Sequence, residues 1–350
     1  MNKIISNIIL PISNGRTHFN LESSILSRLT FLTLIILVSV YFPKSFANED
    51  AIEAYEQKNF SEAKALFERS LKSDPKSVIS LQYLAKIAIK DSEFDDAEDF
   101  ILRAQEIAPK NASVQYDVAQ IMGRQAQESS IFSAPGYAKK TLKAYEQAVQ
   151  LEPSNINYRQ GLIAFYLQAP SIVGGDKELA LEQAIAIETL DPVKGFIALV
   201  DVYQTTEENT KLETLYSTID SKFPESGGLF YRRGLYYQSA KKYSKALVDF
   251  QKAHAAKPQN EDDLTAYAAL YQIGRNSVLS GKDIDNGIKA LQDYLVNAPS
   301  DPILPGADWT KYRLGLLLSN KGDKQNAAKL FKQAKSETKD KRLLKLLKKK

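Results

Sequence analysis

The stretch YLQAPSIVGGDKELALEQA, residues 166–184, contains two glycines followed by charged residues and could form a phosphate-binding loop. Such a loop gathers backbone N–H groups around a phosphate at the start of a helix. The stretch has neither the GxxxxGKS/T spacing nor a GxGxxG after a strand, so we expect no phosphate at this turn. Gly174 and Gly175 instead predict a tight turn with positive φ, and Asp176 predicts the N-cap of the helix that follows.

The side chains that most often carry catalysis are scarce in this chain. It has no cysteine, and its two histidines are His18 and His254. This composition removes most of the usual equipment of metal sites and of nucleophilic catalysis. Carboxylates are abundant, but no pair of them is marked as an acid and a base. We therefore predict a non-enzymatic protein with no cofactor and no metal site.

The charge balance argues against a nucleic-acid-binding groove. Of the 46 basic and 42 acidic residues, four and one lie in residues 1–47, which leaves 42 and 41 in the rest of the chain. A nearly neutral body does not offer the continuous basic face that nucleic acid requires. Positive charge is concentrated in residues 335–350, with eight basic residues against two acidic ones.

Residues 1–47 have the pattern of an export signal. A 14-residue apolar run from Leu29 to Phe42 is shorter than the roughly 20 residues that cross a bilayer. Ser45 and Ala47 lie three residues and one residue before a plausible signal-peptidase cut. We predict a periplasmic or secreted protein. An uncleaved signal that anchors the chain in the inner membrane is the alternative.

The segment after residue 47 contains an internal repeat. FSEAKALFERSLKSDP (60–75), FDDAEDFILRAQEIAP (94–109) and YSKALVDFQKAHAAKP (243–258) share an aromatic residue, an alanine three positions on, a large apolar residue and a final proline. The first two copies are offset by 34 residues, which is typical of paired helices. One helix pair cannot cover its own apolar face, so neighbouring pairs must stack.

This pattern resembles the tetratricopeptide repeat superfamily. YLAKIA (83–88), FYRRGLYY (230–237) and KYRLGLLL (311–318) match the first-helix pattern of that superfamily. The resemblance implies an all-α, right-handed α-solenoid of about eight helix pairs over residues 48–340, with the third, fourth, fifth and seventh pairs degenerate. The residues predicted at the helix crossings are Ala63, Ala97, Thr141, Ala180, Leu212, Ala246, Gly287 and Ala327.

The intervals from Ala97 to Thr141 and from Thr141 to Ala180 are 44 and 39 residues, and these longer intervals predict extended turns at 128–137 and 169–176. One hypothesis is that both turns form a lip beside a binding groove, since long loops in repeat proteins often carry binding. The residues of this predicted lip are Phe132, Pro135, Pro170, Ile172, Gly174 and Gly175. The alternative is purely structural, with Pro170, Ile172 and Val173 packed against neighbouring helices.

The resemblance also implies that the first helices line a concave face that binds a partner. It places Tyr116, Tyr231, Tyr271, Arg275, Trp309 and Tyr312 on that face. One subgroup holds carboxylate tails with lysine and asparagine at such inward positions. The first of those positions carries tyrosine, glutamine or isoleucine here, so carboxylate-tail binding is disfavoured. Some of these tyrosines are instead packing residues if the predicted register is off by one position.

The sequence thus predicts a scaffold or adaptor that binds a protein or peptide of the cell envelope. The alternative is a periplasmic carbohydrate-binding module whose tyrosines stack on peptidoglycan or polysaccharide. Leucines alternate with lysines in residues 341–350, which predicts a basic amphipathic helix capping the last pair. Peripheral contact of this helix with anionic lipid is the second interpretation of its charge.

Overall fold

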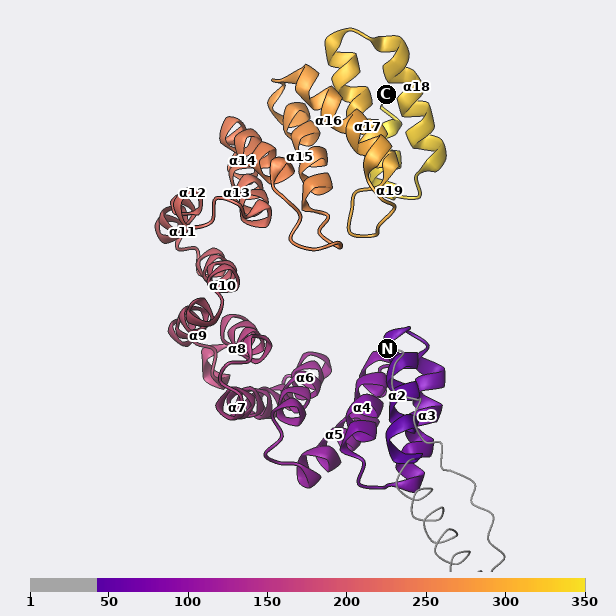
Figure 1. The fold of residues 1–350 in the computed structure, drawn as a ribbon, viewed down its shortest axis with the longest axis vertical. Helices are drawn as coiled ribbons and strands as arrows, with labels where there is room; N and C mark the ends of the chain where they lie inside the picture. The colour runs from indigo at the N-terminus through magenta and orange to yellow at the C-terminus, as the bar shows by residue number, and fades with distance from the viewer. Residues whose placement is uncertain (1–42, 350) are drawn as a thin grey trace, which may run out of the picture. The chain divides into compact units, whose positions relative to one another are not determined.

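Residues 43–349 are described by the computed structural model, and all their regular secondary structure is helical (Figure 1). Successive helices form antiparallel pairs. The first helices of the pairs are α2 (Pro43–Glu56), α4 (Val78–Lys90), α6 (Ala112–Glu128), α8 (Ile156–Gln168), α10 (Pro192–Thr205), α13 (Gly227–Ser239), α15 (Thr265–Ser280) and α17 (Ala307–Lys321). The second helices are α3 (Phe60–Ser73), α5 (Phe94–Ile107), α7 (Ala134–Leu151), α9 (Lys177–Leu190), α11 (Asn209–Ser217), α14 (Tyr243–Ala255), α16 (Ile284–Asn297) and α18 (Lys324–Glu337).

The chain folds into two compact units, and each has apolar cores of its own. Unit 1 comprises residues 1–158, described from residue 43 onward, and residues 172–174. It contains the pairs α2/α3, α4/α5 and α6/α7. Unit 2 comprises residues 159–171 and 175–350, and it contains α9 and every later helix.

The residues predicted at the eight helix crossings are all buried, which confirms the eight helix pairs. Facing positions on the first helices are also small. A Cβ atom placed at Gly234 would lie 2.7 Å from Cε1 of Phe250, and one at Gly274 would lie 2.2 Å from Cγ of Leu291. Each glycine thus lets a first helix approach a large apolar side chain of its own second helix.

The fifth pair has an interrupted second helix. Helix α11 has only 9 residues, and the 4-residue helix α12 (Ile219–Lys222) follows it directly after Thr218. Leu212 and Tyr216 of α11 and Ile219 of α12 are all buried in one core. The large Leu212 therefore occupies a crossing position that small residues fill in other pairs.

The predicted extended turn at 128–137 is shorter than expected. Helix α6 continues to Glu128 and α7 begins at Ala134, so only residues 129–133 lie outside the helices. The extra residues of this repeat lengthen its two helices to 17 and 18 residues. Pro135 lies in the first turn of α7, where a missing N–H costs no helical hydrogen bond.

The connection between α8 and α9 covers residues 169–176 and includes the short 3-10 helix η1 (Ser171–Val173). Gly174 has φ of 104°, and a Cβ at Gly175 would lie 1.7 Å from the carbonyl oxygen of Ala169. Both glycines are therefore required by the backbone path. The Asp176 carboxylate accepts a hydrogen bond from the Leu179 N–H at 2.9 Å, which confirms the predicted N-cap.

The structure describes the chain from the last residues of the predicted export signal onward. Most of the predicted export signal at 1–47, and His18 with it, lies outside the described residues. Helix α2 begins at Pro43 and spans the predicted cut after Ala47, and the Asn48 side chain accepts a hydrogen bond from Ser70 Oγ at 2.9 Å. Among residues 43–349, no helix combines the length and the apolar character needed to cross a bilayer.

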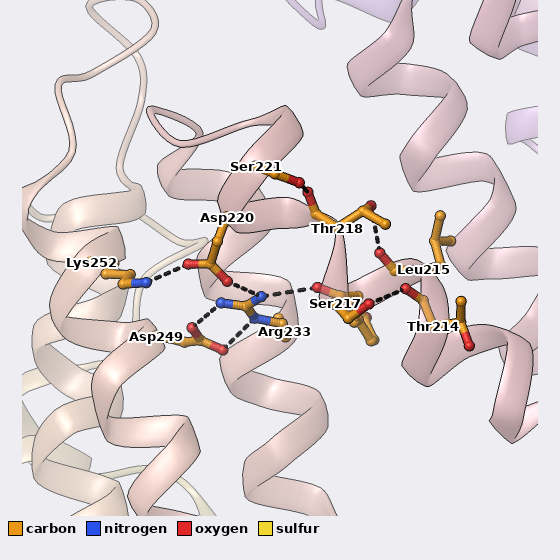
Figure 2. A network of polar contacts seen from close by, with 10 residues as sticks. Thr214, Leu215, Ser217, Thr218, Asp220, Ser221, Arg233, Asp249 and Lys252 are labelled. Atoms are coloured by element: carbon orange, nitrogen blue, oxygen red, sulfur yellow. Dashed lines mark hydrogen bonds and ion pairs between the residues drawn. The ribbon is translucent and has the colours of Figure 1, made fainter.

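A buried ion network joins α12, α13 and α14 (Figure 2). Arg233 of α13 is 5% exposed and donates two hydrogen bonds to the Asp249 carboxylate of α14, at 2.8 and 2.7 Å. Its remaining nitrogen bonds to Asp220 at 2.7 Å and to the Tyr216 carbonyl at 2.9 Å. Hydrogen bonds from Arg233 and Lys252 lower the pKa of Asp220 to about 2. The network fixes the interrupted second helix against the next pair.

Replacing Ala246 by leucine should destabilise unit 2 by roughly 1–3 kcal/mol, because the larger side chain overpacks the α13/α14 crossing. Thermal unfolding followed by circular dichroism measures the change. Ser244→Leu, at an exposed position of the same helix, is the control. An unchanged melting temperature for Ala246→Leu would show that this residue does not set the helix approach.

Replacing Arg233 by methionine should cost about 3–5 kcal/mol of unfolding free energy, because Asp249 would remain buried without its partner. The neighbouring Arg232 forms a surface ion pair with Asp201 at 2.9 Å, so Arg232→Met should cost about 1 kcal/mol or less. Urea unfolding of both variants makes the comparison. Equal losses of unfolding free energy in the two variants would contradict a larger stabilising effect of the buried network.

Candidate functional site

The first helices α13, α15 and α17 lie next to one another in unit 2. Each carries a tyrosine three residues before the glycine that faces the second helix: Tyr231, Tyr271 and Tyr312. Tyr231 is half-buried, whereas Tyr271 and Tyr312 are only 6% and 8% exposed. The Tyr271 ring lies 5.6 Å from that of Tyr294, and burial raises the pKa of Tyr271. Two of the three rings therefore serve packing.

The residue after each of these tyrosines makes a polar contact with the preceding repeat. Arg232 pairs with Asp201 of α10, and Gln272 Nε2 lies 3.5 Å from the Tyr231 hydroxyl. Arg313 donates to the Tyr271 hydroxyl and lies between two rings, 4.9 Å from the centroid of Tyr271 and 4.9 Å from that of Trp309. The sequence pattern predicted Tyr312 as a contact residue but not the adjacent Arg313. Arg313 follows a first-helix tyrosine, as Arg232 and Gln272 do, and this repeated position is the sequence signal that could have identified it.

A pocket of about 360 Å³ opens on this face of unit 2. We call it the arginine pocket, and its lining residues are Tyr271, Gln272, Arg275, Trp309, Arg313 and Arg342. It brings together three of the predicted contact residues, Tyr271, Arg275 and Trp309. Tyr312 and Tyr231 are not among the lining residues. Tyr312 packs against Phe331, with ring centroids 5.9 Å apart, and Tyr231 lies on the neighbouring helix α13.

The C-terminal helix α19 (Lys341–Leu347) contributes one wall of the arginine pocket. Its Leu343 and Leu347 are buried in a cluster with Tyr312. Asp340 caps the helix, accepts a hydrogen bond from Trp309 Nε1 at 3.1 Å and pairs with Arg342 at 3.1 Å. Hydrogen bonds from Arg342 lower the pKa of Asp340 to about 2.

Unit 1 has a hollow of about 490 Å³ on its own first helices, between α4 and α6. Its charges are paired. Asp117 lies 2.8 Å from Lys86 Nζ and accepts a hydrogen bond from Gln82 Nε2 at 2.6 Å. Burial raises the pKa of Asp117, and Lys86 opposes that shift. The predicted contact residue Tyr116 precedes Asp117 and packs against Tyr158, with ring centroids 4.8 Å apart.

The residues of the predicted lip are mostly exposed. Phe132 and Ile172 are 90% and 85% exposed, and Pro135 and Pro170 are exposed as well. Val173, by contrast, is buried. In the connection between α8 and α9, the packing contacts are therefore made by Val173 and the backbone, whereas the Ile172 side chain is exposed. A joint role of the two connections as a lip stays a prediction.

Metal chemistry has no evident site in the part of the chain that the structure describes. Residues 43–349 hold no group of three or more histidine, aspartate or glutamate side chains placed to bind a metal ion. His254 is exposed near the end of α14, and its Nδ1 lies 3.2 Å from the Ala266 carbonyl oxygen. The arginine pocket instead offers arginine and aromatic side chains that can contact a ligand.

Comparison with known protein families finds the tetratricopeptide repeat at two places. One family model, described as tetratricopeptide repeat, matches residues 54–121, and a second with the same description matches residues 310–340. No curated protein matches the chain. One matched segment lies in each compact unit.

Three solved structures are similar to parts of the chain. A thermophilic TPR protein of Thermus thermophilus has 16% identity and a TM-score of 0.42, covering 59% of this chain and 99% of that one. A tetratricopeptide repeat protein from Parabacteroides merdae has 14% identity and a TM-score of 0.45, covering 79% and 98%. PilW, a type IV pilus biogenesis factor, has 14% identity and a TM-score of 0.30, covering 87% and 98%. With TM-scores below 0.5, none of them informs the function of this chain.

Removing residues 341–350 should lower the stability of the last pair by roughly 3 kcal/mol or more, because two buried leucines are lost. The emission of Trp309, the only tryptophan, should change because its Asp340 contact loosens. Thermal unfolding and fluorescence measure both effects. Deleting only residues 348–350 is the control. An unchanged melting temperature with lost binding to anionic vesicles would favour the lipid-contact interpretation.

Proposed function

Because the chain carries tetratricopeptide repeats, we propose that it is a non-catalytic scaffold that binds another protein through the first helices of unit 2. Repeats of this kind generally bind proteins or peptides. The observation that carries the proposal is the half-buried Trp309 next to Arg313 and Arg275 on one accessible face. Tryptophan, tyrosine and arginine are enriched at the energetic centres of protein interfaces.

The proposed location is the cell envelope, with an envelope protein as the partner. The support for export is the pattern of residues 1–47, with its apolar run and the small residues before the plausible cut. Attachment to the inner membrane through an uncleaved signal is the alternative. Detection of the chain in the periplasmic fraction without residues 1–47 would support cleavage, and retention of these residues in the membrane fraction would support the anchor.

Carbohydrate binding is less well supported than protein binding. Stacking on sugar rings needs exposed aromatic faces, but the rings of Tyr271 and Tyr312 are covered by neighbours. Arg313 lies over the ring of Trp309. The accessible part of this face therefore consists largely of guanidinium groups and ring edges. Such groups suit hydrogen bonds and ion pairs with a polypeptide.

In-cell photocrosslinking tests the proposal. A photoreactive residue in place of the half-buried Tyr231 should give a discrete protein adduct, because this position borders the arginine pocket through Gln272. Adding Arg275→Glu should reduce that adduct. A photoreactive residue at Val248, exposed on the second helix α14, is the control. Glycan-only adducts at 231, or equal adducts from both positions, would contradict a protein-binding face there.

A further inference from the structure

The arginine pocket carries positive charge that the described protein does not neutralise. Its lining includes three arginines and no aspartate or glutamate. Within residues 43–349, no carboxylate oxygen lies within 4.0 Å of a nitrogen of Arg275 or Arg313, and only Arg342 has an acidic partner, Asp340. Asp308 stands near Tyr271 but forms no ion pair with these arginines.

Several other basic side chains on the described first helices have acidic partners, in contrast to Arg275 and Arg313. Lys86 pairs with Asp117, Arg232 with Asp201, and Arg233 with Asp220 and Asp249. An ionised group removed from water is costly unless it is paired. Two half-buried guanidinium groups that share one pocket without a counter-charge therefore favour the binding of an anion.

The neighbouring groups add donors and constrain the arginines. Arg313 is held between the Tyr271 and Trp309 rings. Arg275 is held by the side-chain carbonyls of Gln238 and Gln272. Burial lowers the pKa of Arg313, and the charge of Arg275 lowers it further. An anion in the pocket would relieve this repulsion.

We propose that the arginine pocket binds a phosphoryl group. A phosphomonoester carries about −1.5 to −2 charges near pH 7, which matches two unpaired guanidinium groups. Its tetrahedral oxygens accept hydrogen bonds from donors on three helices, here α15, α17 and α19. One planar carboxylate matches a single guanidinium fork and would leave the other unneutralised. Free phosphate and a phosphomonoester share this chemistry.

The test is titration of the purified full-length chain with inorganic phosphate and with glycerol 1-phosphate at low ionic strength. Trp309 lines the pocket and is the only tryptophan, so its fluorescence reports binding directly. Calorimetry gives the stoichiometry. This binding assay needs no protein partner, so its failure and the failure of the proposed scaffold function are distinguishable.

We expect saturable binding of one phosphoryl group per chain. Arg275→Gln and Arg313→Gln should each weaken it at least about tenfold, because each removes charge-assisted hydrogen bonds. Arg342→Gln should weaken it about threefold, since this side chain is 85% exposed and shared with Asp340. Because Arg313 also packs between rings, the exposed Arg342 provides a variant that keeps the fold. Circular dichroism verifies folding of each variant.

Arg232→Gln is the matched control, because it removes the same charge from a neighbouring first helix outside the pocket. The affinity of this variant for the phosphoryl ligands should stay within about twofold of that of the unmodified chain. Tighter binding of glycerol 1-phosphate would identify an ester ligand, and tighter binding of inorganic phosphate would identify the free ion. No saturation up to about 10 mM, equally tight binding of succinate, or an equal loss in Arg232→Gln would overturn the proposal.

Discussion

The close approach of the two helices in each pair is the constraint on which the rest of the structure depends. It is met by a small residue on one helix and a large apolar residue on the other, as Gly234 and Phe250 show. A Cβ at this glycine would overlap the ring, so the spacing of the pair is set by the absence of a side chain. Packing density, rather than any single polar contact, fixes the orientation of the first helices.

Polar contacts then distinguish one repeat from the next. The Arg233 network joins α12, α13 and α14, and such a buried network is satisfied only when every partner is present. On the first helices, Asp117 balances Lys86, whereas Arg275 and Arg313 stand without acids in the described chain. Electrostatic balance thus differs between units whose helices pack in the same way.

The fold was largely predictable from sequence, and the candidate site only in part. Ala63 and Ala97 lie 34 residues apart in matching patterns, so the periodicity alone predicts the pairs. The site depends on which side of a first helix meets its neighbour, and a shift of one residue separates the buried Tyr312 from the pocket-lining Arg313. The contribution of Arg342 was not predictable, because it depends on how α19 docks through Leu343.

The position that follows each first-helix tyrosine has a consequence for how such a protein diversifies. It holds Asp117, Arg232, Gln272 and Arg313 in four different repeats, with acidic, basic and neutral side chains on the same backbone. The helix pair is specified elsewhere, by the small residue and the large one that meet at its crossing. Single substitutions at this position can therefore change the charge of the first-helix face without changing the packing at the crossing, so chains with equal folds can present different charges on that face.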